Sequence, residues 1–492
     1  MVAINPSAAA VDVNRNSLTV IDNRTGKVFN IPITNNSVPA TAFKAMKTDN
    51  SEGRDEDEST RGIRVYDPSY QNTAVCRSSI SYIDGDNGIL RYRGYPIEEL
   101  AEKSSFLEVA YLLIYGELPN KLQFDQFEHE VLHHTFVHTN ASQLMKSFNY
   151  DAHPMGMFVS GIAALSTFHP EANPALVGSD LYTRDDRIMN KQIFRLLGKA
   201  PTIAAMSYRH RIGRRFNHPV ENLGYAGNFL QMMDRLTESN YVPHPKLTKA
   251  LDILFILHAD HEINCSTAAM RHVSSSLVDP YSAVSSAAAS LYGNLHGGAN
   301  AAVIKMLEEI GTVDRVPDFI ERVKAKETKL FGFGHRIYKS YDPRSKIIKK
   351  VAYEVFEICG REELIDVAVA LEEASLKDDY FIKRRLYPNV DFFSGLIYKA
   401  MGFPTDFFPV LFAIPRVAGW LAHWREGLHD SSQKIWRPRQ LYVGEGERVY
   451  VNMDDRADRT ADGKQAKPLM ETIRHQYNKR RAIANYDGKS KL

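Results

Sequence analysis

The 492-residue sequence predicts a mainly α-helical protein with a small β segment near its N-terminus. Three observations lead to this fold class. From about Pro96 onward, apolar residues recur at spacings of three and four, which is the pattern of a helix with one buried face. Residues 18–34 alone resemble a hairpin. The length exceeds the roughly 250–300 residues that one core usually reaches, so two domains are expected.

The β segment comes first in the chain. Residues 18–34 predict two short strands around a turn that carries Asn23 and Gly26, since both residue types favour tight turns. The polar, charged run that follows, residues 49–61, is expected to be a solvated loop.

Helices are expected over residues 106–116, over 247–259 and from about Asn389 to Gly402. The best-marked helix has Asp342 as N-cap and Pro343 at its first position, runs through 344–359 and stops at Gly360. No repeat of solenoid length interrupts this pattern.

Composition excludes several classes of protein. A net charge of +2 gives no reason to expect nucleic acid or an acidic membrane surface as a partner. No apolar run approaches the roughly 20 residues of a membrane span. The three cysteines are scattered and odd in number, which fits neither a disulfide framework nor a set of zinc ligands.

The last three residues, Ser490, Lys491 and Leu492, match a peroxisomal import signal. The N-terminus lacks the apolar segment of a secretory signal. We therefore expect a peroxisomal protein with an import receptor as a partner, and a cytoplasmic one if that signal is not used.

A histidine pair marks the end of the predicted helix 247–259. His258 and His261 lie three residues apart in the sequence His-Ala-Asp-His-Glu and would share a helix face. A metal site is conceivable, but zincins use His-Glu-x-x-His and no second cluster supplies ligands. These residues alone favour structural histidines.

A second histidine, His296, lies in Leu-His-Gly-Gly-Ala-Asn, just before a helical run. A helix N-terminus lowers the pKa of histidine, and a neutral imidazole can donate a hydrogen bond to a developing enolate oxygen. A capping histidine beside a tight turn is an equally good interpretation of this motif alone.

A third histidine, His335, lies in Gly-Phe-Gly-His-Arg. A dinucleotide-binding loop is excluded because the third glycine of that fingerprint is absent. Arg344 follows in the first turn of helix 344–359, where an arginine and free backbone N–H groups favour a carboxylate or phosphate.

Asp391 lies in Asn-Val-Asp-Phe-Phe-Ser-Gly, an apolar context that would raise its pKa and make it a stronger base. Helix N-capping is the competing interpretation. Arg416 and Arg437 lie in apolar or aromatic contexts, where arginines normally have anionic partners.

The ordered combination of these motifs resembles the citrate synthase family from about Arg61 to Tyr442. The motifs that carry the resemblance are HADHE (258–262), HGGAN (296–300), GFGHR (332–336), DPR (342–344), YPNVDF (387–392), PR (415–416) and RPRQLY (437–442).

The resemblance implies a citrate synthase-like two-domain helical fold that assembles as a homodimer or larger oligomer. The β segment and charged loop would occupy residues 1–60. A large helical domain with the C-terminal tail would comprise 61–311 and 421–492, and a small domain 312–420.

The resemblance further implies condensation of acetyl-CoA with oxaloacetate to citrate and CoA. Asp391 would be the base that removes the acyl α-proton, His296 would stabilise the enolate, and His335 would donate to the ketone of oxaloacetate. No metal and no cofactor would be required, since acyl-CoA is a substrate.

The remaining residues of the resemblance would bind substrates. Arg344, Arg416 and Arg437 would hold the two carboxylates of oxaloacetate. His261 would help to position its carbonyl, and Lys339 would lie near the phosphates of CoA.

The identity of the acyl group stays open. Phe393 stands where the bacterial-type branch has tyrosine, and Ala301 where it has glutamate, and both lie beside the acyl site. One or two pocket residues can change the accepted chain length, because each methylene contributes only about 1–3 kcal/mol. A 2-methylcitrate or longer-chain alkylcitrate synthase of secondary metabolism is one alternative. A non-catalytic binding paralogue is another.

Overall fold

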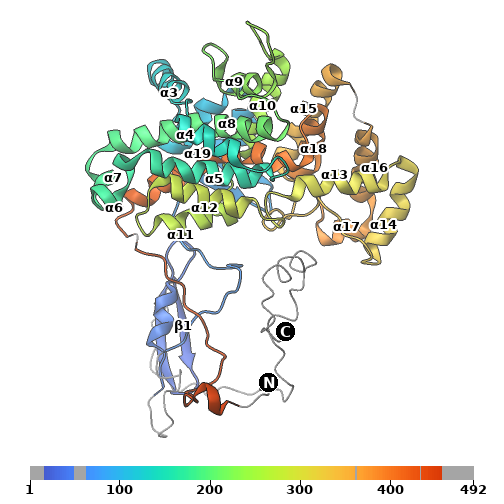
Figure 1. Cartoon of the computed structure of the whole chain (residues 1–492). Coiled ribbons are helices and arrows are strands. Elements are labelled where there is room, and N and C mark those ends of the chain that lie inside the picture. Colours follow the sequence, from blue (N-terminus) through green and yellow to red (C-terminus); the bar gives the residue numbers. More distant parts are fainter. Residues whose placement is uncertain (1–15, 49–61, 361–362, 433, 457–492) are drawn as a thin grey trace, which may run out of the picture. The chain divides into compact units, whose positions relative to one another are not determined.

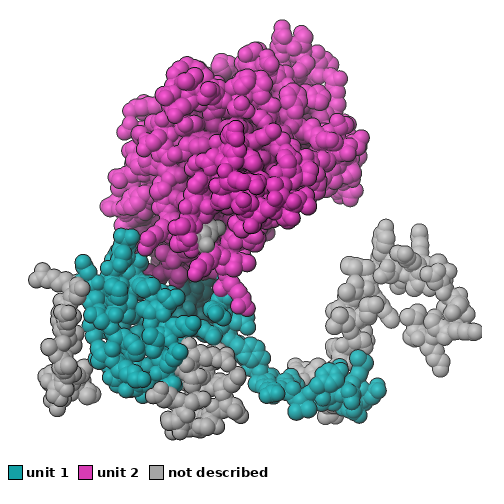
Figure 2. Space-filling view, turned by 90° about the vertical axis from the view of Figure 1, so that its left-hand side faces the viewer, with its two compact units in different colours: residues 1–69, 438–492 teal, residues 70–437 magenta. Residues whose placement is uncertain are grey.

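The computed structural model describes residues 16–48, 62–360, 363–432 and 434–456. The chain forms two compact units, coloured separately in Figure 2. Residues 1–69 and 438–492 make up the first unit, and residues 70–437 make up the second. The run 49–61 that we expected to be a loop lies outside the described residues, as does the C-terminal tripeptide.

The first unit contains the predicted hairpin. Strands β1 (Ser17–Asp22) and β2 (Lys27–Pro32) pair antiparallel, with Ser17 opposite Pro32. The turn between them needs a left-handed residue, which Gly26 supplies at φ +70°. The predicted hairpin is therefore confirmed, and its first strand begins one residue earlier than predicted.

The second unit begins with a small sheet that the sequence analysis did not predict. Strands β3 (Ser81–Asp84), β4 (Ile89–Tyr92) and β5 (Tyr95–Pro96) pair antiparallel in that order. Strands of two to four residues are too short to show a convincing alternation of apolar and polar residues. Pro96 then caps the first helix, where we expected the helical part to begin.

Helices make up most of the rest of this unit, as predicted. Those of seven or more residues are α1 (Ile97–Lys103), α2 (Phe106–Tyr115), α3 (Lys121–His133), α4 (Thr139–Ser147), α5 (Pro154–Phe168), α8 (Asp186–Arg211), α9 (Gly224–Asp234), α10 (Pro245–His258), α11 (Cys265–Ser274), α12 (Pro280–Leu291), α13 (Ala299–Ile310), α14 (Val316–Lys324), α15 (Pro343–Cys359), α16 (Leu364–Lys377), α18 (Val390–Ala400) and α19 (Phe408–His429). Three shorter ones are α6 (Pro174–Val177), α7 (Leu181–Arg184) and α17 (Asp379–Arg384).

The expected helix boundaries are confirmed where local signals were strong. α15 begins after Asp342, whose side chain accepts a hydrogen bond from the amide of Arg344, and it ends at Gly360. α2 begins after Ser105 and ends at Gly116, which is left-handed at φ +101°.

The long helix α19 is buried along most of its length and packs against α2, α5, α8, α10, α11 and α12, in the middle of the helical array of Figure 1. Helices α13 to α18 pack on one another at one end of this array. The domain division at residues 311/312 stays a prediction.

Among the described residues, no helix combines the length and apolarity that a membrane crossing demands.

Candidate active site

The predicted helix-face pair of histidines is wrong in one respect, because α10 ends at His258 and His261 lies beyond it. The hydroxyl of Tyr92 on β4 donates to the carbonyl oxygen of Asp260 at 2.7 Å and accepts from its amide at 3.2 Å. These contacts carry the chain out of the helix, and Glu262 then turns it at φ +55°. His261 is thereby separated from the face of α10.

Asp260, between the two histidines, is fully buried and anchors this turn. Its carboxylate accepts from the Ser81 hydroxyl at 2.6 Å and lies 3.3 Å from Nε2 of His423. Burial alone would raise its pKa, but His423, Arg416 and the Ser81 hydrogen bond outweigh burial and lower it.

The motif of His335 pairs with the motif of Asp391. The amide of Asn389 donates to the carbonyl oxygen of Gly332 at 2.9 Å, and the amide of Gly334 donates to that of Tyr387 at 2.8 Å. Both glycines are left-handed, at φ +76° and +75°, and a Cβ on Gly332 would lie 2.7 Å from the side chain of Val303. Glycine is needed here so that two distant segments can meet.

The backbone sets the hydrogen-bonding state of His335. Its Nδ1 accepts from the amides of Ile337 at 3.0 Å and Tyr338 at 3.2 Å. A nitrogen that accepts carries no proton, so we assign the proton to Nε2. Burial, followed by the charge of Arg344, lowers the pKa of His335 to about 4. His335 is therefore a neutral donor at pH 7.

His296 is also neutral, but for a different reason from the one expected. Its Nε2 accepts from the amide of Ser266 at 3.3 Å, in the first turn of α11, and lies 3.0 Å from the Ser266 hydroxyl. Burial, followed by Arg416, lowers the pKa of His296 to about 4. The helix terminus in contact with His296 is thus that of α11, not that of α13, and the proton lies on Nδ1.

Asp391 does not cap its own helix. Asn389 does so, with Oδ1 accepting from the amide of Asp391 at 3.0 Å. The capping interpretation of Asp391 is therefore wrong, and its carboxylate has no hydrogen bond or ion pair with any other described residue. Burial raises its pKa to about 6, although Arg344 and Arg416 oppose that rise. A carboxylate of this kind is a stronger base than a solvated one.

Arg344 is already paired. Its Nε and Nη2 donate to the two carboxylate oxygens of Asp342 at 3.1 and 2.9 Å, and both residues are buried. Asp342 also accepts from the amide of Val390, which ties the start of α18 to the start of α15. The expected arginine at a helix start is confirmed, and its two Nη1–H groups and the second Nη2–H are left for a further anion.

Arg416 is buried on α19 without an anion among the described residues. Its Nε donates to the carbonyl oxygen of His258 at 2.6 Å, and its guanidinium lies 4.7 Å from the ring of Phe412. Burial lowers its pKa to about 10, against the opposing charges of Asp260 and Asp391, so it stays charged at pH 7. A buried, charged guanidinium needs an anionic partner.

These groups converge on one region. Burial lowers the pKa of His261 well below its usual value. Electrostatic interactions lower it further, and they come from Arg344, His335, Arg416 and His296. The rings of His261 and His335 lie 5.1 Å apart between centroids. The region therefore offers one base, neutral hydrogen-bond donors and positive charge.

Two predicted residues are not brought into this group. Arg437 is exposed at the end of the second unit and makes no hydrogen bond or ion pair within the described chain. Lys339 is also exposed, with Nζ 3.5 Å from Asp86. Neither position tests the role that the resemblance implies.

Comparisons with known proteins show the family of this chain. The family model described as "Citrate synthase, C-terminal domain" matches residues 69–439. The chain belongs to the citrate synthase family. A citrate synthase of Dictyostelium discoideum is 61% identical over 90% of this chain and 85% of its own. A peroxisomal citrate synthase of the same organism is 60% identical over 92% of this chain and 90% of its own length.

Solved structures of the citrate synthase family have the same fold. One is the citrate synthase of Thermoplasma acidophilum in a ternary complex with carboxymethyl coenzyme A and oxaloacetate. It superposes with a TM-score of 0.71 at 30% identity, over 78% of this chain and 98% of its own.

Three residues that contact or position the predicted site residues had not been predicted from the sequence. Tyr338 contacts His261, Ser266 holds His296, and Asn389 caps the helix of Asp391. Only Asn389 had a local signal, because asparagine is a favoured N-cap. The other two act across the fold, so nothing in their sequence neighbourhood marks them.

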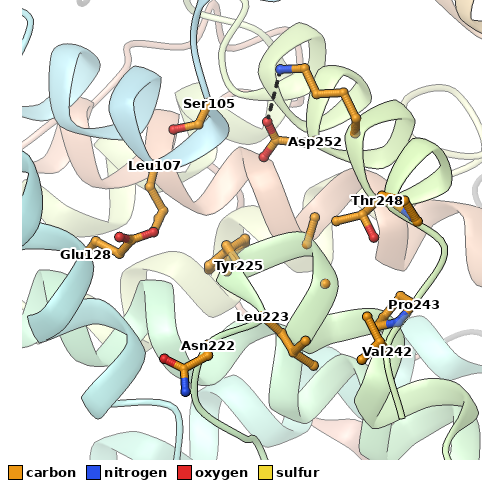
Figure 3. A pocket seen from close by; sticks show the side chains of 15 residues that line it. Ser105, Leu107, Glu128, Asn222, Leu223, Tyr225, Val242, Pro243, Thr248 and Asp252 are labelled. Atoms are coloured by element: carbon orange, nitrogen blue, oxygen red, sulfur yellow. Dashed lines mark ion pairs between the residues drawn. The ribbon is translucent and has the colours of Figure 1, made fainter. Parts of the chain in front are cut away.

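A cavity of about 370 Å³ lies apart from the predicted site residues and is shown in Figure 3. It lies among α2, α3, α9 and α10, and its polar lining includes Asp252, which forms an ion pair with Lys249 at 3.7 Å. None of the sequence-predicted site residues lines it. Within the described part of the chain, no cluster of three or more His, Cys, Asp or Glu side chains could hold a metal ion.

Proposed function

We propose that this chain condenses acetyl-CoA with oxaloacetate to give citrate and free CoA. The observation that carries the proposal is the carboxylate of Asp391, with a pKa of about 6 and no partner in the described chain, within electrostatic reach of Arg344 and of Arg416, the buried arginine that lacks an anion. Enolisation of a thioester needs a base and an oxyanion donor together, because its α-protons are only weakly acidic.

Asp391 would remove the α-proton of acetyl-CoA, and His296 would stabilise the enolate oxygen. Since Nε2 of His296 accepts from Ser266, its Nδ1–H is the group available to donate. A donor held by the protein before the reaction stabilises the developing charge without reorganisation, which is usually a large contribution to catalysis.

Oxaloacetate would bind with its ketone toward Nε2–H of His335, and this histidine would supply the proton as the carbon–carbon bond forms. His261 would help to orient the carbonyl. Arg416 would hold one carboxylate, with Nη1 and Nη2 not bonded within the described chain. Nη1 of Arg344 would contribute to the binding of the other carboxylate.

Hydrolysis of the thioester after condensation would release citrate and CoA. Every step is acid–base chemistry at carbon or at the thioester, so the proposal includes no cofactor other than the CoA of the substrate. Lys339, exposed beside the loop of His335, is proposed to contact the phosphates of CoA.

We further propose a homodimer in which Arg437 completes the oxaloacetate site of the other subunit. Its exposure, and the lack of any described partner, support a role outside its own chain. A peroxisomal location is proposed from Ser490–Leu492, and the 60% identity to a relative named as peroxisomal supports it.

The test is release of free CoA from acetyl-CoA by the purified full-length chain, with and without oxaloacetate, and identification of citrate by mass spectrometry. Oxaloacetate-dependent release is expected. Propionyl- and hexanoyl-CoA run in parallel would reveal a methylcitrate or alkylcitrate synthase. Binding of both substrates without release of CoA would favour a non-catalytic paralogue.

A further inference from the structure

Tyr338 contacts both histidines that we assign to oxaloacetate. Its hydroxyl oxygen lies 3.2 Å from Nε2 of His261, and its backbone amide donates to Nδ1 of His335 at 3.2 Å. Its ring centroid lies 5.6 Å from that of His261 and 4.7 Å from that of His335. The side chain is only 2% exposed, so these contacts are shielded from water.

The backbone on both sides of Tyr338 is held by the turn between β3 and β4. The amide of Lys339 donates to the carbonyl oxygen of Gly85 at 2.8 Å. On the other side, a Cβ on Gly85 would lie only 2.1 Å from the carbonyl oxygen of Ile337, so the two backbones are in close contact. The backbone on both sides of the tyrosine is thus in direct contact with this turn.

The direction of the hydrogen bond follows from the two groups. Burial raises the pKa of Tyr338, so its hydroxyl keeps its proton, and it lowers that of His261, so the imidazole is neutral. A phenol is a stronger donor than a neutral imidazole N–H. The hydroxyl therefore donates to Nε2, which leaves the proton of His261 on Nδ1.

We propose that Tyr338 is a positioning residue, whose hydroxyl orients His261 while its backbone amide orients His335, so that both rings face oxaloacetate in one arrangement. The inference rests on the proposed function and deepens it. The hydroxyl is not assigned any contact with substrate. Its effect passes through His261, which makes the proposal testable by a mutant cycle.

The test replaces the hydroxyl alone. Tyr338→Phe is expected to weaken oxaloacetate binding to the free enzyme about five- to tenfold, the loss of one neutral hydrogen bond, as measured by calorimetry. The Michaelis constant for acetyl-CoA should be unchanged. Tyr341→Phe is the matched control, because it removes a hydroxyl three residues away that donates to Glu372 at 2.7 Å. This control should bind oxaloacetate like the wild type.

The mutant cycle separates positioning from general stability. In a His261→Gln background, Tyr338→Phe should change oxaloacetate affinity by less than twofold. Recurrence of the full five- to tenfold loss in that background, or wild-type affinity in Tyr338→Phe itself, would overturn the inference. A wild-type chain that neither binds oxaloacetate nor releases CoA would instead refute the proposed function.

Discussion

Nε of Arg416 donates to the carbonyl oxygen of His258 at 2.6 Å, and this is the only hydrogen bond of that side chain within the described residues. The last carbonyl group of α10 thus fixes the guanidinium on α19 and leaves its other nitrogens for a ligand. This relationship gives the first prediction.

Arg416→Lys should weaken oxaloacetate binding about ten- to a hundredfold and leave acetyl-CoA nearly unaffected. Lysine keeps the charge but loses the planar pair of donors, and a charge-assisted hydrogen bond contributes about 1.5–3 kcal/mol. Dissociation constants for each substrate provide the measurement. Arg425→Lys, on the same helix but in an ion pair with Asp186, is the control. A loss confined to acetyl-CoA would assign Arg416 to the CoA phosphates instead.

Asp342→Asn should destabilise the fold by about 3–5 kcal/mol, because it leaves the buried charge of Arg344 without its carboxylate. The chain offers a matched control at the surface. Asp185 caps α8 and pairs with Arg187 two residues later, in the same local pattern, but Arg187 is 91% exposed. Asp185→Asn should cost less than about 1 kcal/mol in urea unfolding. Equal losses at the two sites would show that burial of the pair does not matter.

Asp391→Asn should reduce turnover by at least about a hundredfold, since a general base typically contributes about 10²–10⁴-fold. In the wild type, kcat/KM for acetyl-CoA should fall as the pH drops through about 6, where this carboxylate becomes protonated. Oxaloacetate binding should persist in the variant. Turnover above about a hundredth of wild type would contradict the assignment of the base.

The same pKa predicts an effect of Asp391 on stability. A carboxyl group whose folded-state pKa is raised binds protons more tightly when folded. Its ionisation therefore destabilises the folded state at pH values above the pKa of the group in the unfolded chain, near 3.8. This destabilisation is complete above about pH 6. Asp391→Asn should raise the melting temperature at pH 7.5 and do so less below pH 5. A lower melting temperature at pH 7.5 would count against the raised pKa.

Arg437 gives a prediction about assembly. If it acts in the site of the partner, then mixing inactive Asp391→Asn and inactive Arg437→Ala subunits should restore activity, because one site of each hybrid dimer contains no substitution. Up to about a quarter of wild-type activity is expected from random pairing of equal amounts. If Arg437 acts within its own chain, both sites of the hybrid stay defective and no activity returns.

Peroxisomal import should depend on Ser490–Leu492. A fluorescent fusion with its fluorophore at the N-terminus and lacking these three residues is expected to be diffuse, while the intact fusion is punctate. Punctate signal from the truncated fusion, in cells without a native copy to carry it, would place the targeting information elsewhere.

The sequence by itself determined the features that depend on neighbouring residues. Periodicity placed the helices, Asp342 and Gly360 marked the ends of α15, and Asn23 and Gly26 marked the hairpin turn. The ordered motifs also determined the family. These signals are local because capping, turn geometry and amphipathic spacing are set within a few residues along the chain.

Only the tertiary structure decided how the motifs act on one another. Tyr92 ends α10 before His261, α11 supplies the amide that holds His296, and the pairing of 332–334 with 387–389 brings His335 toward Asp391. Each of these contacts joins residues at least 30 positions apart. Burial and long-range hydrogen bonds depend on how whole elements pack, and the residues next to each group in the sequence do not specify that packing.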